Sequence, residues 1–172
     1  MANKADGAGK LVLKPGVVCS FMANLCETQD RESFQFSQVI CVGQELDNLG
    51  KAAEEIKDCD RIDFSNNGLQ DVSSLKDLTR LTWLNLSNNK IKSMAVFATD
   101  DALPNLKWLD ISNNKFNEWP AFKCPKLDNL NISGNKLEKV NEAWAGHPNL
   151  RILSASDNKF KSLAVFKNCP KL

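Results

Sequence analysis

A pattern of hydrophobic and polar positions recurs five times between residues 59 and 160. The pattern is L-x-x-L-x-L-x-x-N-x-L, with other apolar residues allowed at the leucine positions, and it begins at residues 59, 81, 106, 127 and 150. Successive copies start 22, 25, 21 and 23 residues apart. Alternating apolar residues predict a short strand with those side chains inward, and repeats of this length stack to bury a common core. The sequence therefore predicts a solenoid with one parallel strand from each repeat.

The second half of each repeat is apolar two, five and usually eight positions after the asparagine, as at Leu69 and Val72. These columns are expected on the outer, convex side, where so short a repeat leaves room mainly for 3-10 turns. Segment 93–105 is the longest of these outer segments and has room for a true helix. The pattern thus predicts an α/β solenoid with a parallel concave sheet and short 3-10 or helical convex segments. Trp119 and Trp144 are expected to fill its core or rim.

Residues 15–58 are expected to close the amino-terminal end of the solenoid. Segment 36–46 (FSQVICVGQEL) keeps the apolar positions of a repeat but has Gln44 in place of the asparagine, which indicates a degenerate opening repeat. Ahead of it, residues 16–28 place apolar side chains at helical spacing, which predicts an amphipathic capping helix. Residues 1–14 are expected to be weakly ordered.

Residues 59–172 are expected to hold five repeats and to break off at the start of a sixth. The sequence CPKL at 169–172 repeats the CPKL at 124–127, whose Leu127 opens the fourth repeat, so Leu172 stands where a further repeat would begin. The last apolar layer and the strand edge beside Leu153 and Ala155 would then lie open. We expect further repeats of a longer protein, or another chain, to cover this edge.

The asparagine of the repeat forms a column of its own. A buried side-chain amide must find hydrogen-bond partners, and here backbone groups of the turn and of the neighbouring coil are within its reach. We therefore expect a structural role for the column, which consists of Asn67, Asn89, Asn114, Asn135 and Asn158.

Outward side chains also form columns, because parallel strands in register place equivalent positions about 4.8 Å apart. The third position reads Arg61, Trp83, Trp108, Asn129 and Ile152, the fifth reads Asp63, Asn85, Asp110, Asn131 and Ser154, and the seventh is always serine. Adjacent tryptophans are typical interface anchors, and acidic neighbours suit a basic residue of a partner. The alternative is that the two indoles stack and merely shield the sheet. We expect all residues of the first two columns except Ser154 to bind an extended or helical protein segment.

Composition narrows the class of function. The chain has 172 residues, of which 42% are hydrophobic and 25% charged, and its formal net charge is +1. The outward columns form no basic stripe, so nucleic acid is not expected as a direct partner. His147 is the one histidine, and no phosphate-binding or nucleophile motif is present. We therefore expect no enzyme activity, no catalytic residue, no cofactor, no metal site and no small-molecule substrate.

The sequence also bears on the cellular compartment. No window approaches the roughly 18 continuous apolar residues of a membrane helix, and the amino terminus lacks the long apolar segment of a secretory signal. The six cysteines form no C-x-x-C pair, so free and mostly buried thiols are expected. These features predict a cytoplasmic protein without membrane contact.

The repeats resemble the leucine-rich-repeat subfamily that includes the regulatory subunit of protein phosphatase 1, axonemal dynein light chain 1 and the U2 snRNP A-prime protein. Its members are non-enzymatic scaffolds, which implies a protein partner in a larger assembly. The path from GVVCSFMANLC through FSQVICVGQELDNL to CDRIDFSNNGLQDVSSLKDLTRLTWLNLSNNKI resembles the leucine-rich-repeat proteins of the ciliary radial spoke. This resemblance covers residues 15 to about 94 and implies a structural component of the axoneme in a cilium or flagellum.

Two alternatives remain open. The stretches DNLGKAAEEIKDCDRIDFSNNGL and DALPNLKWLDISNNKF also resemble the spliceosomal A-prime proteins, which hold an RNA-binding partner on the concave face. That resemblance implies a nuclear RNP adaptor. The subfamily as a whole also implies a phosphatase-regulating adaptor as a third possibility.

Overall fold

The computed structural model describes residues 10–11, 19–24, 35–44, 49, 56–99, 102–119, 123–139, 146–162, 164, 166 and 169–172. In this part the chain forms an eight-stranded sheet whose strands lie side by side in sequence order. The strands are β1 (Lys10–Leu11), β2 (Cys19–Asn24), β3 (Gln35–Ile40), β4 (Arg61–Asp63), β5 (Trp83–Asn85), β6 (Trp108–Asp110), β7 (Asn129–Asn131) and β8 (Ile152–Ser154). The first three pair antiparallel, whereas β3 to β8 pair parallel.

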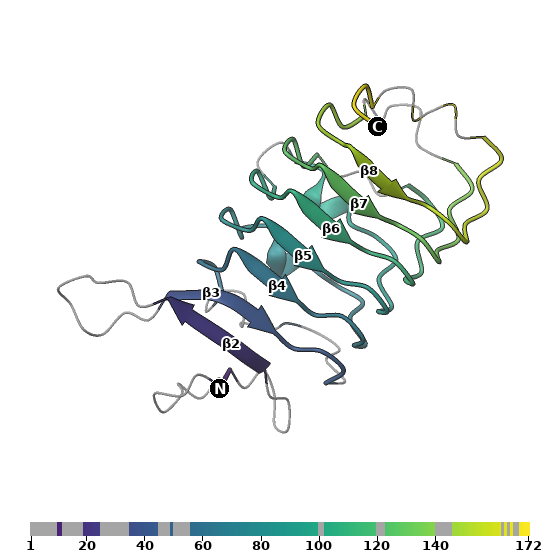
Figure 1. Ribbon diagram of the computed structural model, residues 1–172. Helices are drawn as coiled ribbons and strands as arrows, with labels where there is room; N and C mark the ends of the chain where they lie inside the picture. The colour runs from purple at the N-terminus through teal and green to yellow at the C-terminus, as the bar shows by residue number, and fades with distance from the viewer. Residues whose placement is uncertain are drawn as a thin grey trace.

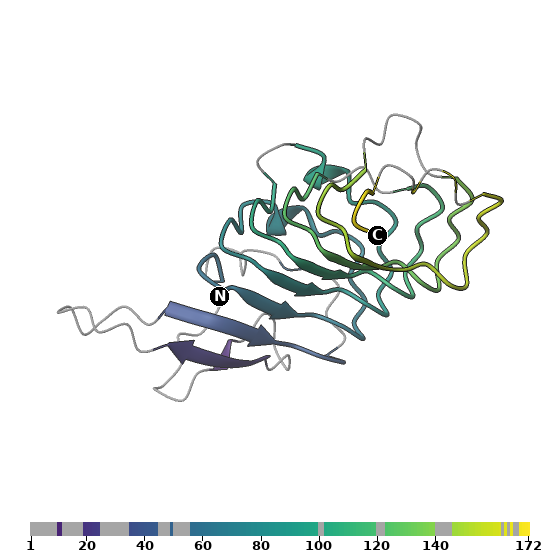
Figure 2. The same cartoon turned by 45° about the horizontal axis from the view of Figure 1, so that its top comes forward.

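From β3 onward each strand begins one coil of a solenoid (Figure 1). Figure 2 shows the strands along one side of the coils, with η1 (Ser73–Leu75) and η2 (Ala95–Phe97) on the other. These two elements are single 3-10 turns, and neither is long enough to cross a membrane. The predicted solenoid with a parallel concave sheet and short convex segments is confirmed, and segment 93–105 holds η2 where the sequence left room for a longer helix.

The core is a stack of apolar layers, because each coil buries the same positions as the coil before it. Leu84 and its neighbours in the adjacent strands are fully buried, and so are Leu69, Leu75 and Phe97 on the convex side. Burying one such leucine contributes roughly 1.5 to 3 kcal/mol. Trp119 lies in this core and packs edge-on against Phe166 at 5.6 Å between ring centroids. Trp144 lies outside the described residues.

The asparagine column holds successive coils together. Asn89 donates from Nδ2 to Leu86 O and Ser87 O of its own turn and to Phe64 O of the coil before, at 2.9 to 3.1 Å. Its Oδ1 accepts the backbone N–H of Leu69 at 3.0 Å. The same pattern of donated and accepted bonds recurs at Asn67, Asn114, Asn135 and Asn158. One side chain per repeat thus satisfies backbone groups that the turn leaves without strand partners.

The residue before each of these asparagines adopts a left-handed backbone conformation. Positive φ angles of 52° to 67° occur at Gly43, Asn66, Asn88, Asn113, Gly134 and Asp157. Glycine, asparagine and aspartate are the residues that tolerate this region best. Gly43 stands in the opening repeat, so this coil makes the same turn although Gln44 replaces the asparagine. The backbone N–H of Gln44 donates to Asn67 Oδ1 at 2.9 Å.

The predicted amphipathic helix over residues 16–28 is wrong where the structure describes that segment. Cys19–Asn24 form β2, which pairs antiparallel with β3 through Ser20 opposite Ile40 and Phe21 opposite Val39. A strand fits because the first parallel strand of a solenoid has an edge of unpaired backbone groups, and a paired strand satisfies them where a helix would not. β1 lies within the segment expected to be weakly ordered, whose other residues fall outside the described part.

The prediction of free thiols is wrong at Cys41. Cys41 is disulfide-bonded, whereas Cys59, Cys124 and Cys169 are free and buried. Burial raises the pKa of the Cys59 and Cys124 thiols to about 12, so neither is a reactive nucleophile at neutral pH.

Candidate protein interface on the concave face

The strands stack their outward side chains in two columns, because β4 to β8 pair in register. Arg61 lies opposite Trp83, Trp83 opposite Trp108, Trp108 opposite Asn129, and Asn129 opposite Ile152. The second column is in the same register and consists of Asp63, Asn85, Asp110, Asn131 and Ser154. The structure therefore brings together every residue that the sequence assigned to this face.

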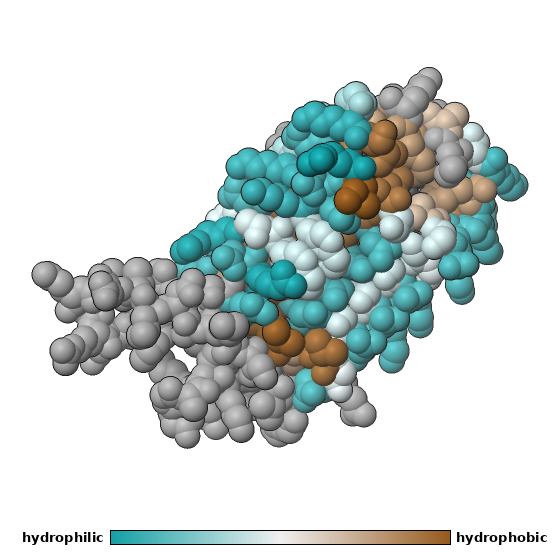
Figure 3. Space-filling view, viewed as in Figure 1, coloured by the Kyte–Doolittle hydropathy of each residue, from teal (hydrophilic) through white to brown (hydrophobic). Residues whose placement is uncertain are grey.

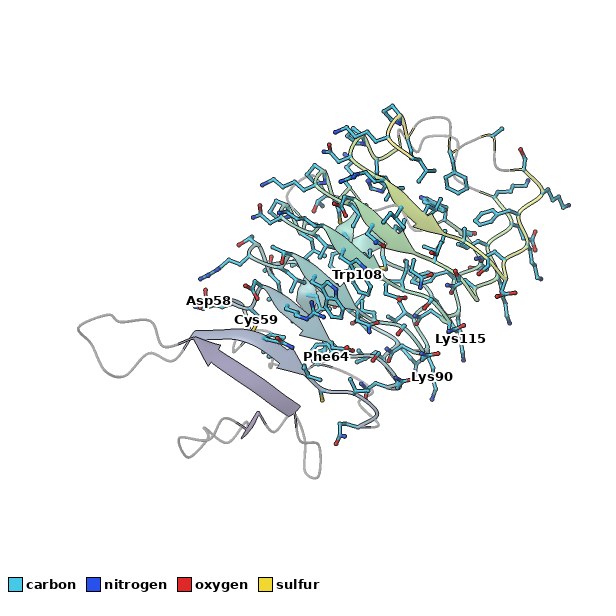
Figure 4. All side chains as sticks on the ribbon, in the orientation of Figure 1. Asp58, Cys59, Phe64, Lys90, Trp108 and Lys115 are labelled. Atoms are coloured by element: carbon cyan, nitrogen blue, oxygen red, sulfur yellow. The ribbon has the colours of Figure 1, made fainter. Side chains whose placement is uncertain are left out.

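Three planar groups stack at the centre of the first column. The indoles of Trp83 and Trp108 lie 4.3 Å apart between ring centroids with an interplanar angle of 5°. The guanidinium carbon of Arg61 lies 3.6 Å from the centroid of the Trp83 ring. Both indoles are half-buried on the sheet surface. Figure 4 labels Trp108 among the side chains on the strands.

This stack changes how a partner can reach the tryptophans. Both faces of the Trp83 ring are occupied, one by Arg61 and the other by Trp108. A cation of the partner therefore has no free face on Trp83, although the sequence suggested such a contact. The two indoles do stack, as the alternative interpretation required, but both tryptophans remain half-exposed. Stacking fixes the side-chain rotamers, so the edges form a preorganised apolar surface.

The second column alternates carboxylates with amides. Asn85 Nδ2 donates to Asp63 Oδ2 at 3.3 Å, and Asn131 Nδ2 donates to Asp110 Oδ2 at 2.9 Å. The alternation keeps the two carboxylates from lying on adjacent strands, where like charges repel. Each member from Asp63 to Asn131 also accepts, through Oδ1, the backbone N–H of the serine two residues later. These bonds fix the side chains, so the column presents a rigid polar strip to a partner.

The serine column is more enclosed than its outward position suggests. Ser65, Ser87 and Ser112 are buried at the edge of the face, beneath the turns that follow the strands. They contribute backbone donors to the polar strip and little exposed surface.

Apolar side chains lie at both ends of the face, as Figure 3 shows in brown. Ile152 is 54% exposed at one end, and Ile40 and Val42 are each 38% exposed at the other. Sequence reasoning included Ile152 but missed Ile40 and Val42. They occupy the fifth and seventh positions of segment 36–46, so extending the outward columns into the opening repeat would have found them.

His147 has a structural position and lies away from this face. It is buried, at the position that Leu103 and Cys124 occupy in earlier repeats, and Leu150 N–H donates to its carbonyl as the next strand approaches. Burial lowers the pKa of its imidazole to about 4, against a smaller raising effect of a hydrogen bond with the Cys124 backbone. Within the described ranges no group of three or more histidine, cysteine or acidic side chains has a geometry suited to a metal ion.

Comparisons with known proteins agree with this architecture. A family model described as leucine rich repeat matches residues 104–160, and a second model with the same description matches residues 80–98. With the coiled parallel sheet, these matches show that the chain contains leucine-rich repeats, as the sequence predicted. This class consists typically of non-enzymatic scaffolds that bind other proteins.

Human leucine-rich repeat-containing protein 23 is 33% identical over 79 residues, which are 46% of this chain and 22% of that protein. Internalin C2 of Listeria monocytogenes has a similar structure, with a TM-score of 0.68 and 28% identity over 77% of this chain and 57% of its own. A leucine-rich-repeat protein of Leptospira interrogans gives a TM-score of 0.65 and 26% identity over 74% of this chain and 33% of its own. The chain thus spans about a fifth of the length of the curated relative.

Proposed function

We propose that this protein is a non-enzymatic scaffold that holds a segment of a partner protein on its concave face. The observation that carries this proposal is the stack of exposed Arg61 on the half-exposed Trp83 and Trp108, which their mutual contacts hold in place on the sheet. Aromatic side chains that are rigid before binding lose little entropy on association, which makes them effective anchors.

The chemistry of the face defines the segment that fits it. Apolar side chains of the partner would pack on the indole edges and on Ile152, since these lie in one column. A lysine or arginine of the partner would lie over Asp63 or Asp110, whose carboxylates are half-exposed beside that column. An amphipathic segment with one basic side therefore suits this face.

For the assembly, we propose a structural role in the radial spoke of a ciliary or flagellar axoneme, in the cytoplasm. Support comes from the resemblance in residues 15 to about 94 to spoke proteins of this class. Part of that resemblance is the opening coil, in which the degenerate strand β3 pairs directly with β4 in repeat register. The nuclear RNP adaptor and the phosphatase-regulating adaptor are the competing assemblies.

Affinity purification of the tagged protein from ciliated cells tests both the proposed binding face and the proposed assembly. Axonemal proteins retained after detergent extraction are expected, whereas a small nuclear RNA or a phosphatase catalytic subunit would instead favour a competing assembly. The Trp83→Ala/Trp108→Ala variant is expected to lose most of the bound partner, because truncating such anchors often costs about 2 kcal/mol or more each.

A matched control is available on the solenoid's other surfaces. Gln70→Ala/Asn117→Ala changes two exposed polar residues outside the strands and is expected to retain the partner. Circular dichroism and thermal melting establish that both variants are folded. Full partner recovery by the folded tryptophan variant contradicts the proposal for the concave face, whichever assembly is recovered.

A further inference from the structure

The cationic side chains on the two edges of the sheet differ in whether they have acceptors within the protein. On the edge where the strands begin, three cations each have an acceptor on the coil before them. Arg80 lies 4.0 Å from Asp58, and Lys126 Nζ donates to Asn105 Oδ1 at 2.7 Å. Lys171 Nζ makes the same bond with Asn149 Oδ1, also at 2.7 Å. Acceptors and cations therefore alternate from coil to coil along this edge.

On the edge where the strands end, four lysines follow the asparagine column on successive coils. We call Lys90, Lys115, Lys136 and Lys159 the lysine column. The backbone N–H of each lysine donates to a carbonyl of the coil before it, as from Lys90 to Leu69 O and from Lys115 to Ile91 O, both at 2.9 Å. These bonds stack the lysines about one strand spacing, roughly 4.8 Å, apart at the backbone. Figure 4 shows Lys90 and Lys115 projecting from neighbouring coils.

The positive charge of the lysine column has few ion-pair partners within the protein. All four lysines are exposed, and among the residues that the structure describes only Lys159 of this column forms an ion pair, with its Nζ 3.8 Å from Glu138 Oε1. Stacked like charges repel one another, so the arrangement does not favour folding. Nor does the coil require a lysine here, because Gly68 occupies the equivalent position in the first repeat.

We propose that the lysine column is a second binding surface, which takes an acidic segment of a partner protein. Aligned, exposed ammonium groups attract carboxylates. Binding is most favourable where it also relieves the repulsion between the ammonium groups. The surface lies at an edge of the sheet, so it is separate from the concave face and independent of the function proposed for it.

A polypeptide suits this edge better than a nucleic acid does. The exposed carboxylates of Glu118, Glu138 and Asp157 follow or precede lysines of the column by two or three residues, and they would repel a continuous chain of phosphates. Phe116, next to Lys115, is buried and offers no surface on which a base could stack. An acidic peptide can instead space its carboxylates to avoid these positions.

Fluorescence anisotropy of a labelled oligo-glutamate peptide at physiological ionic strength tests the proposal. Saturable binding that weakens with added salt is expected. Lys115→Gln/Lys136→Gln is expected to weaken binding roughly three- to tenfold, the range that two exposed charge pairs allow. The matched control Lys126→Gln/Lys171→Gln makes the same change in net charge on the opposite edge and is expected to leave binding unchanged.

A variant that is expected to bind the peptide more tightly tests the lysine column independently. Glu138→Gln frees Lys159 and is expected to tighten binding about twofold, whereas Asp128→Asn at the opposite edge is not. Equal losses in the two lysine double variants, absence of saturable peptide binding, or tighter binding of an oligothymidylate than of the peptide would each overturn the proposal. The Trp83→Ala/Trp108→Ala variant keeps peptide binding if the two surfaces are separate.

Discussion

The side-chain amide of Asn89 replaces backbone hydrogen bonds that a turn between strands cannot make for itself. It bonds three carbonyls and one N–H, and it joins its own coil to the one before. The residue type and its spacing made this role predictable, because a regularly repeated amide among apolar side chains must be satisfied by nearby backbone. The left-handed residue before it was also visible in the sequence, as a column of asparagine, glycine and aspartate.

Asn89→Ala is expected to lower the free energy of unfolding by about 3 kcal/mol, because it leaves the buried Leu69 N–H without its acceptor and removes the three bonds that Nδ2 donates to backbone carbonyls. Urea denaturation followed by circular dichroism measures the change. Asn158→Ala is the matched control, since Asn158 is half-exposed and water can replace its bonds, so a loss of about 1 kcal/mol is expected. Equal losses at the two positions would contradict a role set by burial.

His147 is expected to make stability depend on pH. Its pKa is about 4 in the folded protein and about 6.5 when unfolded, so the unfolded chain binds the proton more tightly. The stabilisation is therefore present above pH 6.5 and is lost as the pH falls toward 4, by about 3 kcal/mol in total.

Urea midpoints measured between pH 7 and pH 4 test this dependence. His147→Leu is the informative variant, because Leu103 already occupies the equivalent position in an earlier repeat. The variant is expected to lose this part of the acid sensitivity, while the carboxylates continue to titrate in both proteins. An unchanged pH profile in the folded variant would show that His147 is not the group responsible.

At the scale of elements, the strands and their register follow from the repeat, whereas the amino-terminal cap does not. Once five copies are aligned, parallel pairing fixes which side chains share a column, and the observed pairs such as Trp83 with Trp108 are those of the alignment. Residues 16–28 carry no repeat, and a short apolar run fits both helical and strand periodicity. The open edge of β3 decides in favour of β2, and that edge is a tertiary feature which local periodicity does not contain.

The stack on the concave face could be predicted only in part from the sequence. Sequence alignment places Arg61, Trp83 and Trp108 in one column, but it does not determine their rotamers. The structure shows that the guanidinium and both rings are parallel neighbours, which closes both faces of Trp83. The partner contacts expected from the sequence shift accordingly from ring faces to ring edges.

At the scale of the whole molecule, one repeat yields surfaces of different chemistry. The concave face combines aromatic and apolar side chains with a strip of carboxylates and amides, whereas the lysine column lies along one edge of the same sheet. Because every coil adds one residue to each column, a partner that runs along the solenoid meets one side chain of a given column on every coil. Although the formal net charge is only +1, the charged side chains are thus arranged in columns on separate surfaces.

Site-specific photo-crosslinking tests the concave face most directly. A photoreactive amino acid at Asn129, which lies opposite Trp108 on the next strand, is expected to capture the partner, whereas the same group at exposed Asn117 outside the strands is not. The Asn129 product is expected to disappear in the Trp83→Ala/Trp108→Ala background. Crosslinks formed from Asn117 alone, or an Asn129 product that survives loss of both indoles, would show that the partner binds elsewhere.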